Sequence, residues 1–277
     1  MDLLVSTDWL DAELGAPDLR IVDATYFLPS MGRGARAEHE AGHIPGAVFF
    51  DIDEISDDAS PLPHMLPSAH KFASRMQSLG LGDGNRIVVY DNSPLHSAAR
   101  AWWMLRIFGA PHVALLDGGL QKWRAEGRPL ASGREQHRQG HFTASLDADA
   151  VADKPAMLSL AGAEVVDARS PARFAGAEAE PRAGLAAGHI PGSRNAPQGE
   201  FFNPDNSWKR GGELRAVFDS AGVDLARPMV TTCGSGVTAA VVLFGAQLLG
   251  KTDVRLYDGS WSEWGADPAT PKATGPA

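Results

Sequence analysis

The sequence predicts an α/β protein made of two tandem domains, each with a parallel sheet that helices cover on both faces. Two observations predict this class. Strand-like and helix-like patterns alternate along the chain, and the second half of the chain repeats the first. Short apolar runs at 86–91 and 229–232 are typical of buried strands, and helical patterns follow them. Parallel strands need crossover connections, which place helices on both faces of the sheet.

The first half shows its elements in a clear order. Ser6 or Thr7 caps a short helix, and a strand follows at 20–26. A Gly-His-Ile-Pro-Gly turn at 42–46 leads into the next strand, and Ser68 caps a helix that extends to about residue 79. The remaining elements are a strand at 86–91, a helix at 97–108, a strand at 112–117 and a helix around Trp123.

The repeat is visible as a nearly constant shift between matching landmarks. Asp167 lies 144 residues after Asp23, His189 146 after His43, Cys233 142 after Asp91, and Trp264 141 after Trp123. So few and such long units indicate a duplicated domain and not a solenoid. We therefore expect a first domain at 1–133, a linker at 134–154 and a second domain at 155–277. We expect the Pro-, Ala- and Thr-rich tail after Asp267 to be disordered.

Composition narrows the function classes. The 277 residues suggest about two domains, and a net charge of −9 argues against nucleic acid or an anionic membrane as a partner. No apolar run approaches the roughly 18 residues that span a bilayer, and the acidic N-terminus does not resemble a signal peptide. A single cysteine excludes an internal disulfide and a Cys-rich metal site, and it suits a reducing cytoplasm. We expect no metal and no cofactor.

That single cysteine stands at the start of a glycine-rich loop. Cys233 ends an apolar run, Gly234, Ser235 and Gly236 follow, and a helical pattern begins at Val237. A loop of this kind can curl so that its backbone N–H groups point at one atom, and the helix N-terminus adds the positive end of its dipole. The pattern favours a nucleophilic thiolate at Cys233, although a lone cysteine is often only a buried core residue.

Asp91 occupies the corresponding place in the first half. A carboxylate cannot replace a thiolate as a sulfur nucleophile, so we expect the first domain to be non-catalytic. In α/β folds ligands bind beyond the carboxyl ends of the strands. We therefore expect the active site in the second domain, where it faces the first.

These motifs resemble the rhodanese superfamily, and within it the tandem-domain sulfurtransferases that use 3-mercaptopyruvate. The resemblance covers nearly the whole chain, and its most specific signal is Cys-Gly-Ser-Gly-Val-Thr at 233–238. The other matching segments are the Gly-His-Ile-Pro-Gly turns at 42–46 and 188–192, Phe-Phe-Asp-Ile-Asp at 49–53, His-Met-Leu-Pro at 64–67 and Asp-Gly-Ser-Trp at 258–261.

The resemblance implies two tandem rhodanese-like domains and ping-pong catalysis. Cys233 would take sulfur from 3-mercaptopyruvate as a persulfide and release pyruvate, and a thiol such as thioredoxin, or cyanide, would then collect the sulfur. It assigns the catalytic set Cys233, Ser235, His64 and Asp53. It assigns donor binding to two arginines and to the loop after the cysteine: Arg173, Arg182, Gly234, Gly236, Val237 and Thr238.

Several of these residues have simpler interpretations. Ser235 could merely shape the loop, and His64 with Asp53 could form a surface salt link. Without the resemblance, Arg173 and Arg182 would be taken as solvated charges. Some relatives carry an aromatic residue where this chain has His96, so an aromatic wall is not assured there. Arg100 fits a place facing the active site, a helix cap or the edge of the core equally well.

Three rival functions remain open. A thiosulfate sulfurtransferase would benefit from basic residues after the cysteine, but the loop at 234–236 carries no positive side chain. A cysteine phosphatase needs an arginine six residues after the cysteine, where this chain has Ala239. A non-catalytic module that carries persulfide would not need the arginines.

Overall fold

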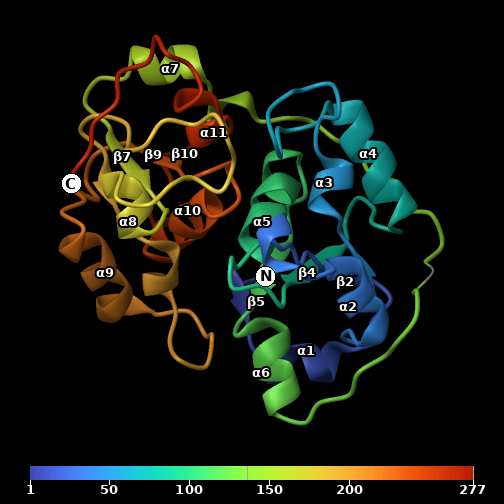
Figure 1. Ribbon diagram of the computed structural model, residues 1–277. Helices are drawn as coiled ribbons and strands as arrows, with labels where there is room; N and C mark the ends of the chain where they lie inside the picture. The colour runs from blue at the N-terminus through green and yellow to red at the C-terminus, as the bar shows by residue number, and fades with distance from the viewer. Residues whose placement is uncertain (136, 277) are drawn as a thin grey trace. The chain divides into compact units, whose positions relative to one another are not determined.

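The computed structural model describes residues 1–135 and 137–276, and these divide into two compact units (Figure 1). The first unit contains Met1–Asp58, Leu66–Asp147 and Phe202–Trp208. The second contains Ala59–Met65, Ala148–Phe201 and Lys209–Ala277. Each unit is built on one five-stranded parallel sheet with helices on both faces, which confirms the predicted fold class.

The first sheet has the strand order β1-β5-β4-β2-β3. One face packs on α1 and α6, where Leu10, Leu120 and Trp123 join the inward side chains of the strands in one core. The opposite face packs on α5, whose Trp102 Nε1 donates to the Val113 carbonyl at 3.0 Å. The elements of this unit are β1 Leu4–Val5, α1 Thr7–Glu13, β2 Leu19–Asp23, η1 Pro29–Met31, α2 Ala35–Ala41, β3 Ala47–Phe49, α3 Ile52–Ile55, α4 Ala69–Ser78, β4 Arg86–Tyr90, α5 Ala98–Ile107, β5 Val113–Leu116 and α6 Gly119–Ala125.

The second sheet has the order β6-β10-β9-β7-β8, which is the first order repeated element for element. One face packs on α7 and α11 through Met157, Trp261 and Trp264, and the buried helix α10 lies against β9 and β10. The elements are η2 Ala148–Ala150, β6 Val151–Ala152, α7 Lys154–Leu158, β7 Glu164–Asp167, α8 Pro171–Ala175, β8 Arg194–Asn195, η3 Gln198–Phe201, α9 Gly211–Ser220, β9 Met229–Thr232, α10 Ala239–Leu248, β10 Val254–Tyr257 and α11 Ser260–Trp264. The identical strand order supports a duplication of one ancestral domain.

The predicted linker at 134–154 is largely tied to the two units, and its residue 136 lies outside the described residues. Thr143 donates from its backbone N–H and its hydroxyl to Asp83, at 2.8 and 2.7 Å, which anchors this stretch to the first unit. Val151–Ala152 forms β6 and pairs with β10 in the second sheet. No helix among the described residues is long and apolar enough to cross a membrane.

The tail after Asp267 is ordered through residue 276, so the prediction of disorder was wrong. Ala273 and His189 exchange two backbone hydrogen bonds of 2.9 and 2.8 Å, and Trp264 Nε1 donates to the Pro271 carbonyl at 2.7 Å. The first unit repeats this bridge between His43 and Ala131. Composition misled the prediction because these partners lie about 80 residues apart in the chain, beyond the range of local patterns. A side chain at Gly188 would collide with the Ala273 carbonyl at 2.1 Å.

Two loops belong to the unit opposite to their place in the sequence. Residues 59–65 group with the second unit, and residues 202–208, which lie 143 positions later, group with the first. This shift lies within the range of 141 to 146 found for the internal repeat, so the two loops are equivalent parts of the two domains. Each unit therefore includes one short segment from the other half of the sequence.

Asp205, in the loop at 202–208, should make the free energy of unfolding depend on pH in the acidic range. Hydrogen bonds from the Ser207 hydroxyl and backbone N–H, and then Lys122, lower the pKa of Asp205 to about 2. A lowered folded pKa stabilises the protein above the ordinary value of 3.8, and that stabilisation is lost as pH falls toward 2. Because the side chain is 53% exposed, we expect Asp205→Asn to cost at most about 1 kcal/mol at pH 7.

Urea unfolding at pH 7 and pH 3 tests this expectation. The difference between wild type and Asp205→Asn should shrink by about half at pH 3, which lies within the titration window. Asp149→Asn, a change at an exposed acidic residue, provides the control. An equal cost at both pH values would show that the Asp205 carboxylate does not act through its charge.

Candidate functional site

Cys233 lies at the carboxyl end of the central strand β9, directly before the loop that leads into α10. The residue is 2% exposed, and Gly236 turns the loop with a φ of 79°. The backbone N–H groups of Gly234, Ser235 and Val237 donate to no acceptor within the described residues of the chain. Loop amides without partners beside a sulfur atom can stabilise negative charge on it, as the sequence predicts.

The Asp-Gly-Ser-Trp segment at 258–261 and the next residue, Ser262, form hydrogen bonds with this loop. The Cys233 N–H donates to Ser260 Oγ at 3.2 Å, and the Trp261 N–H donates to the Cys233 carbonyl at 3.0 Å. Ser262 donates to the Gly234 carbonyl from its N–H at 2.8 Å and its hydroxyl at 2.7 Å. Ser260 has a φ of 48°, a conformation that is costly outside glycine. The strained turn therefore fixes the position of the cysteine backbone.

Ser235 carries the hydroxyl that meets a histidine from the distant loop 59–65. His64 Nδ1 and Ser235 Oγ share a hydrogen bond of 2.9 Å, although the residues are 171 positions apart. Both side chains belong to buried residues of the second unit. His64 has a φ of 60°, so its backbone is held in a region that few side chains adopt. The pair places a group that can transfer protons two residues from the sulfur.

Arg173 lies directly against the cysteine loop. A Cβ built on Gly234 would come within 3.0 Å of Arg173 Nη2, so glycine at this position lets the guanidinium approach the loop backbone. Glu180 holds Arg173 through Nε at 3.3 Å and through an ion pair with Nη2. The Arg173 side chain is 19% exposed. A cation placed here can pair with an anionic ligand of the cysteine site.

Arg182 and Asp53 are the other two predicted residues. Arg182 is half-buried and makes no hydrogen bond or ion pair with another residue in the described part of the chain. Asp53 is an exposed residue in the first turn of α3, in the first unit, whereas His64 belongs to the second. The roles of Arg182 and Asp53 stay predictions.

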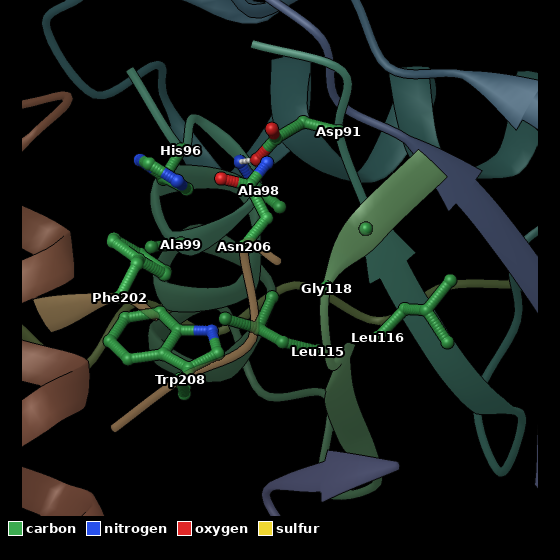
Figure 2. Close-up of a pocket in the computed structure, with 11 residues that line it drawn as sticks. Asp91, His96, Ala98, Ala99, Leu115, Leu116, Gly118, Phe202, Asn206 and Trp208 are labelled. Carbon is green, nitrogen blue, oxygen red and sulfur yellow. Dashed lines mark hydrogen bonds between the residues drawn. The ribbon is translucent and has the colours of Figure 1, made fainter. Parts of the chain in front are cut away.

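Asp91 in the first unit occupies the place that Cys233 has in the second, and its carboxylate fills its own loop. It accepts a hydrogen bond from the Ser93 N–H at 2.9 Å. It also accepts one from the Ala98 N–H at 2.7 Å (Figure 2). Burial raises the pKa of Asp91. The carboxyl group of Asp91 thus satisfies backbone amides in its own loop, whereas the N–H groups of Gly234, Ser235 and Val237 donate to no described acceptor.

His96 and Arg100 lie near Asp91 in different surroundings. The His96 ring stacks on Phe202 with centroids 3.5 Å apart and lines the small cavity drawn in Figure 2. Phe202 and Trp208, from residues 202–208, add a phenyl ring and an indole ring to this cavity. Arg100 is fully buried, with its guanidinium 4.7 Å from the centre of the Trp103 ring, which favours the core position among the predicted alternatives.

Sequence reasoning missed the residues that support the site. Arg169 and Glu180 form a buried ion-pair chain next to Arg173, and Ser260 and Ser262 hold the cysteine loop. Glu180 lies two residues before the predicted Arg182, and Ser260 lies inside the Asp-Gly-Ser-Trp segment at 258–261, so nearby motifs were the available signal for both. Within the described residues, no cluster of His, Cys, Asp and Glu is arranged to hold a metal ion.

Fold and site together define a two-domain α/β protein with a cysteine in a glycine-rich loop, at the carboxyl end of the central strand in the second of its two equivalent sheets. A model of the rhodanese-like domain matches residues 6–126 and 149–267. The chain belongs to the rhodanese family.

Two relatives and one solved structure illustrate the similarity. Human 3-mercaptopyruvate sulfurtransferase is 47% identical over 270 residues, which cover 94% of this chain and 91% of the relative. A thiosulfate sulfurtransferase of Cricetulus griseus is 42% identical over 271 residues, with the same two coverages. The crystal structure of SseA from Escherichia coli, described as a 3-mercaptopyruvate sulfotransferase, superposes with a TM-score of 0.86 at 41% identity and covers 94% of this chain and 99% of SseA.

Proposed function

We propose that this protein is a sulfurtransferase that moves sulfur from 3-mercaptopyruvate to a thiol or to cyanide, with a persulfide on Cys233 as the intermediate. The observation that carries the proposal is the arrangement around the cysteine. Open loop amides, the Ser235–His64 pair and Arg173 all meet at one loop. The similarity to 3-mercaptopyruvate sulfurtransferases over 94% of the chain supports this choice of donor.

In the first half-reaction the Cys233 thiolate attacks the donor sulfur. An S–S bond forms and the C–S bond breaks, and the electron pair of that bond passes to the enolate of pyruvate. The sulfur keeps its own proton or loses it to solvent, and one proton must reach the enolate carbon. Ser235 and His64 supply that proton or hold the group that does. Asp53 is the third residue that we assign to this set. The loop amides stabilise the charge on the sulfur that remains.

Arginines bind the carboxylate and keto groups of the donor. Arg173 lies at Gly234, one residue from the nucleophile, and Arg182 is not engaged by other described residues. A guanidinium fork matches a carboxylate in plane and in hydrogen-bond direction. Gly234, Gly236, Val237 and Thr238 form the remaining wall of the donor site.

In the second half-reaction an acceptor thiolate, such as that of thioredoxin, or cyanide attacks the outer sulfur. The S–S bond to Cys233 breaks, and its electron pair restores the thiolate. The acceptor leaves as a persulfide or as thiocyanate. A cycle that runs through one unpaired cysteine needs a reducing compartment, and we therefore propose the cytoplasm.

Thiosulfate is the competing donor, since a thiosulfate sulfurtransferase is 42% identical to this chain. The loop at 234–236 carries no cation to hold a small dianion, and Arg173 is already paired with Glu180. These features favour the singly charged keto acid. A persulfide carrier without turnover would not need the proton-transfer pair next to the sulfur.

Intact mass spectrometry with a pyruvate assay tests the proposal. Exposed to 3-mercaptopyruvate without acceptor, the protein should gain one sulfur atom and release one pyruvate, and cyanide or reduced thioredoxin should then remove the sulfur. Faster loading from thiosulfate than from 3-mercaptopyruvate would favour the competing donor. Sulfur loading without repeated turnover would support the carrier, and the absence of any added sulfur would refute the proposal.

A further inference from the structure

We propose that Glu180 is a positioning residue that aims Arg173 at the carboxylate of the sulfur donor. This inference rests on the proposed function and adds a residue that the catalytic set does not contain. Glu180 lies at the centre of a continuous chain of ion pairs, which begins at the end of strand β7 and ends at the cysteine loop.

The chain begins with a rigid anchor. Asp167, the last residue of β7, accepts from Arg169 Nε at 3.0 Å and from Nη2 at 2.6 Å. Arg169 also donates to the Gly188 carbonyl at 2.8 Å, and its guanidinium lies 4.5 Å from the centre of the Trp261 ring. The Arg169 side chain is fully buried, so these contacts fix it in one position.

Glu180 binds both Arg169 and Arg173, so the fixed position of Arg169 determines where Arg173 lies. Its Oε1 accepts from Arg169 Nη1 at 2.6 Å and from Arg173 Nε at 3.3 Å, and its Oε2 pairs with Arg173 Nη2. The Glu180 side chain is 3% exposed. Burial opposes the charge of Arg169, but Asp167 and Glu180 outweigh it and raise the pKa of this guanidinium. Arg169 thus stays charged and paired with both carboxylates.

This pairing leaves one edge of Arg173 for a ligand. Glu180 takes the edge formed by Nε and Nη2, and Nη1 donates to no other described residue. The free edge of a planar guanidinium points away from the occupied one. Because Nη2 also lies 3.0 Å from the Cβ position of Gly234, the free edge is held beside the cysteine loop. Glu180 therefore sets where a donor carboxylate can bind relative to Cys233.

The expected consequence concerns donor binding more than sulfur chemistry. Glu180→Gln keeps the shape of the side chain but removes the charge that orients both arginines. We expect the kcat/KM for 3-mercaptopyruvate to fall about 10- to 100-fold, mostly through a higher KM, because a small misplacement of a binding group has effects of this size. Loading of Cys233 from inorganic polysulfide, which has no carboxylate, should stay within about twofold of wild type.

A double-mutant cycle with Arg173→Met tests whether Glu180 changes kcat/KM by acting through Arg173. If Glu180 acts through Arg173, Glu180→Gln should change kcat/KM by less than about threefold when Arg173 is already methionine. Glu178→Gln, two residues away and exposed, is the matched control and should leave both donors unaffected. Additive losses in the cycle would overturn the proposal.

Loss of the fold is tested separately, because Glu180→Gln leaves Arg169 with one partner fewer. If this variant also fails to load from polysulfide, Glu180→Asp takes its place, since it retains the charge and shortens the reach. Glu180→Asp should load from polysulfide and still show the raised KM. Failure of both variants with polysulfide would make Glu180 a structural residue and refute the inference. Failure of wild type to release pyruvate would refute the proposed function instead.

Discussion

Cys233→Ser should abolish pyruvate release from 3-mercaptopyruvate, with a loss of at least about 10⁴-fold in kcat. Removal of a catalytic nucleophile has effects of this order, since the rest of the site cannot supply the missing bond. The chain has only one cysteine, so no second thiol can accept the sulfur. A hydroxyl is nearly isosteric with the thiol, and its proton is far harder to remove at neutral pH. The coupled pyruvate assay and the intact mass should therefore both show no reaction.

The fold should survive this change, which keeps the result interpretable. The Cys233 N–H donates to Ser260 Oγ and its carbonyl accepts from the Trp261 N–H, and the substitution leaves both backbone bonds in place. We expect the melting temperature to shift by only a few degrees, and Cys233→Ala serves as the matched variant without a hydroxyl. Persisting pyruvate release in both variants would remove Cys233 from the mechanism.

His64→Asn should lower kcat for pyruvate release by about 10²- to 10⁴-fold, the range expected when a positioned proton-transfer group is lost. Asparagine tolerates the left-handed backbone that His64 adopts, with its φ of 60°, so the loop should keep its shape. Ser235→Ala should produce a similar loss, because the two side chains share the 2.9 Å hydrogen bond.

Two comparisons separate proton transfer from a structural role. The double variant should be about as slow as either single variant, since the two groups act as one unit. His70→Asn, at an exposed position of α4, is the control and should leave kcat unchanged. Losses that multiply in the double variant would contradict a shared role for Ser235 and His64.

Local sequence patterns were sufficient to predict the fold class and to single out Cys233 as the nucleophile. The alternation of strands and helices, the duplication and the strand–loop–helix around Cys233 depend on residues close together in sequence. A constant shift between the halves then pointed to Asp91 as the counterpart of the cysteine, and both residues follow central strands of equivalent sheets. Such features are visible because backbone periodicity and turn chemistry act over a few residues.

The residues that hold the site in place could not be predicted from local sequence patterns. Glu180 resembles any acidic residue in a polar loop until Arg169 and Arg173 are seen on either side of it. The role of Ser260 depends on the position of the Cys233 N–H, 27 residues earlier. The tail after Asp267 looked disordered by composition, yet it pairs with the turn at His189.

The sequence by itself thus determined a duplicated α/β chain with one nucleophilic thiol at the end of a strand. The tertiary structure alone decided which groups surround that thiol, above all the hydrogen bond that joins His64 to Ser235 across 171 positions. The physical reason is that hydrogen bonds and ion pairs act over a few ångströms of space, and only the folded chain determines which distant residues come that close.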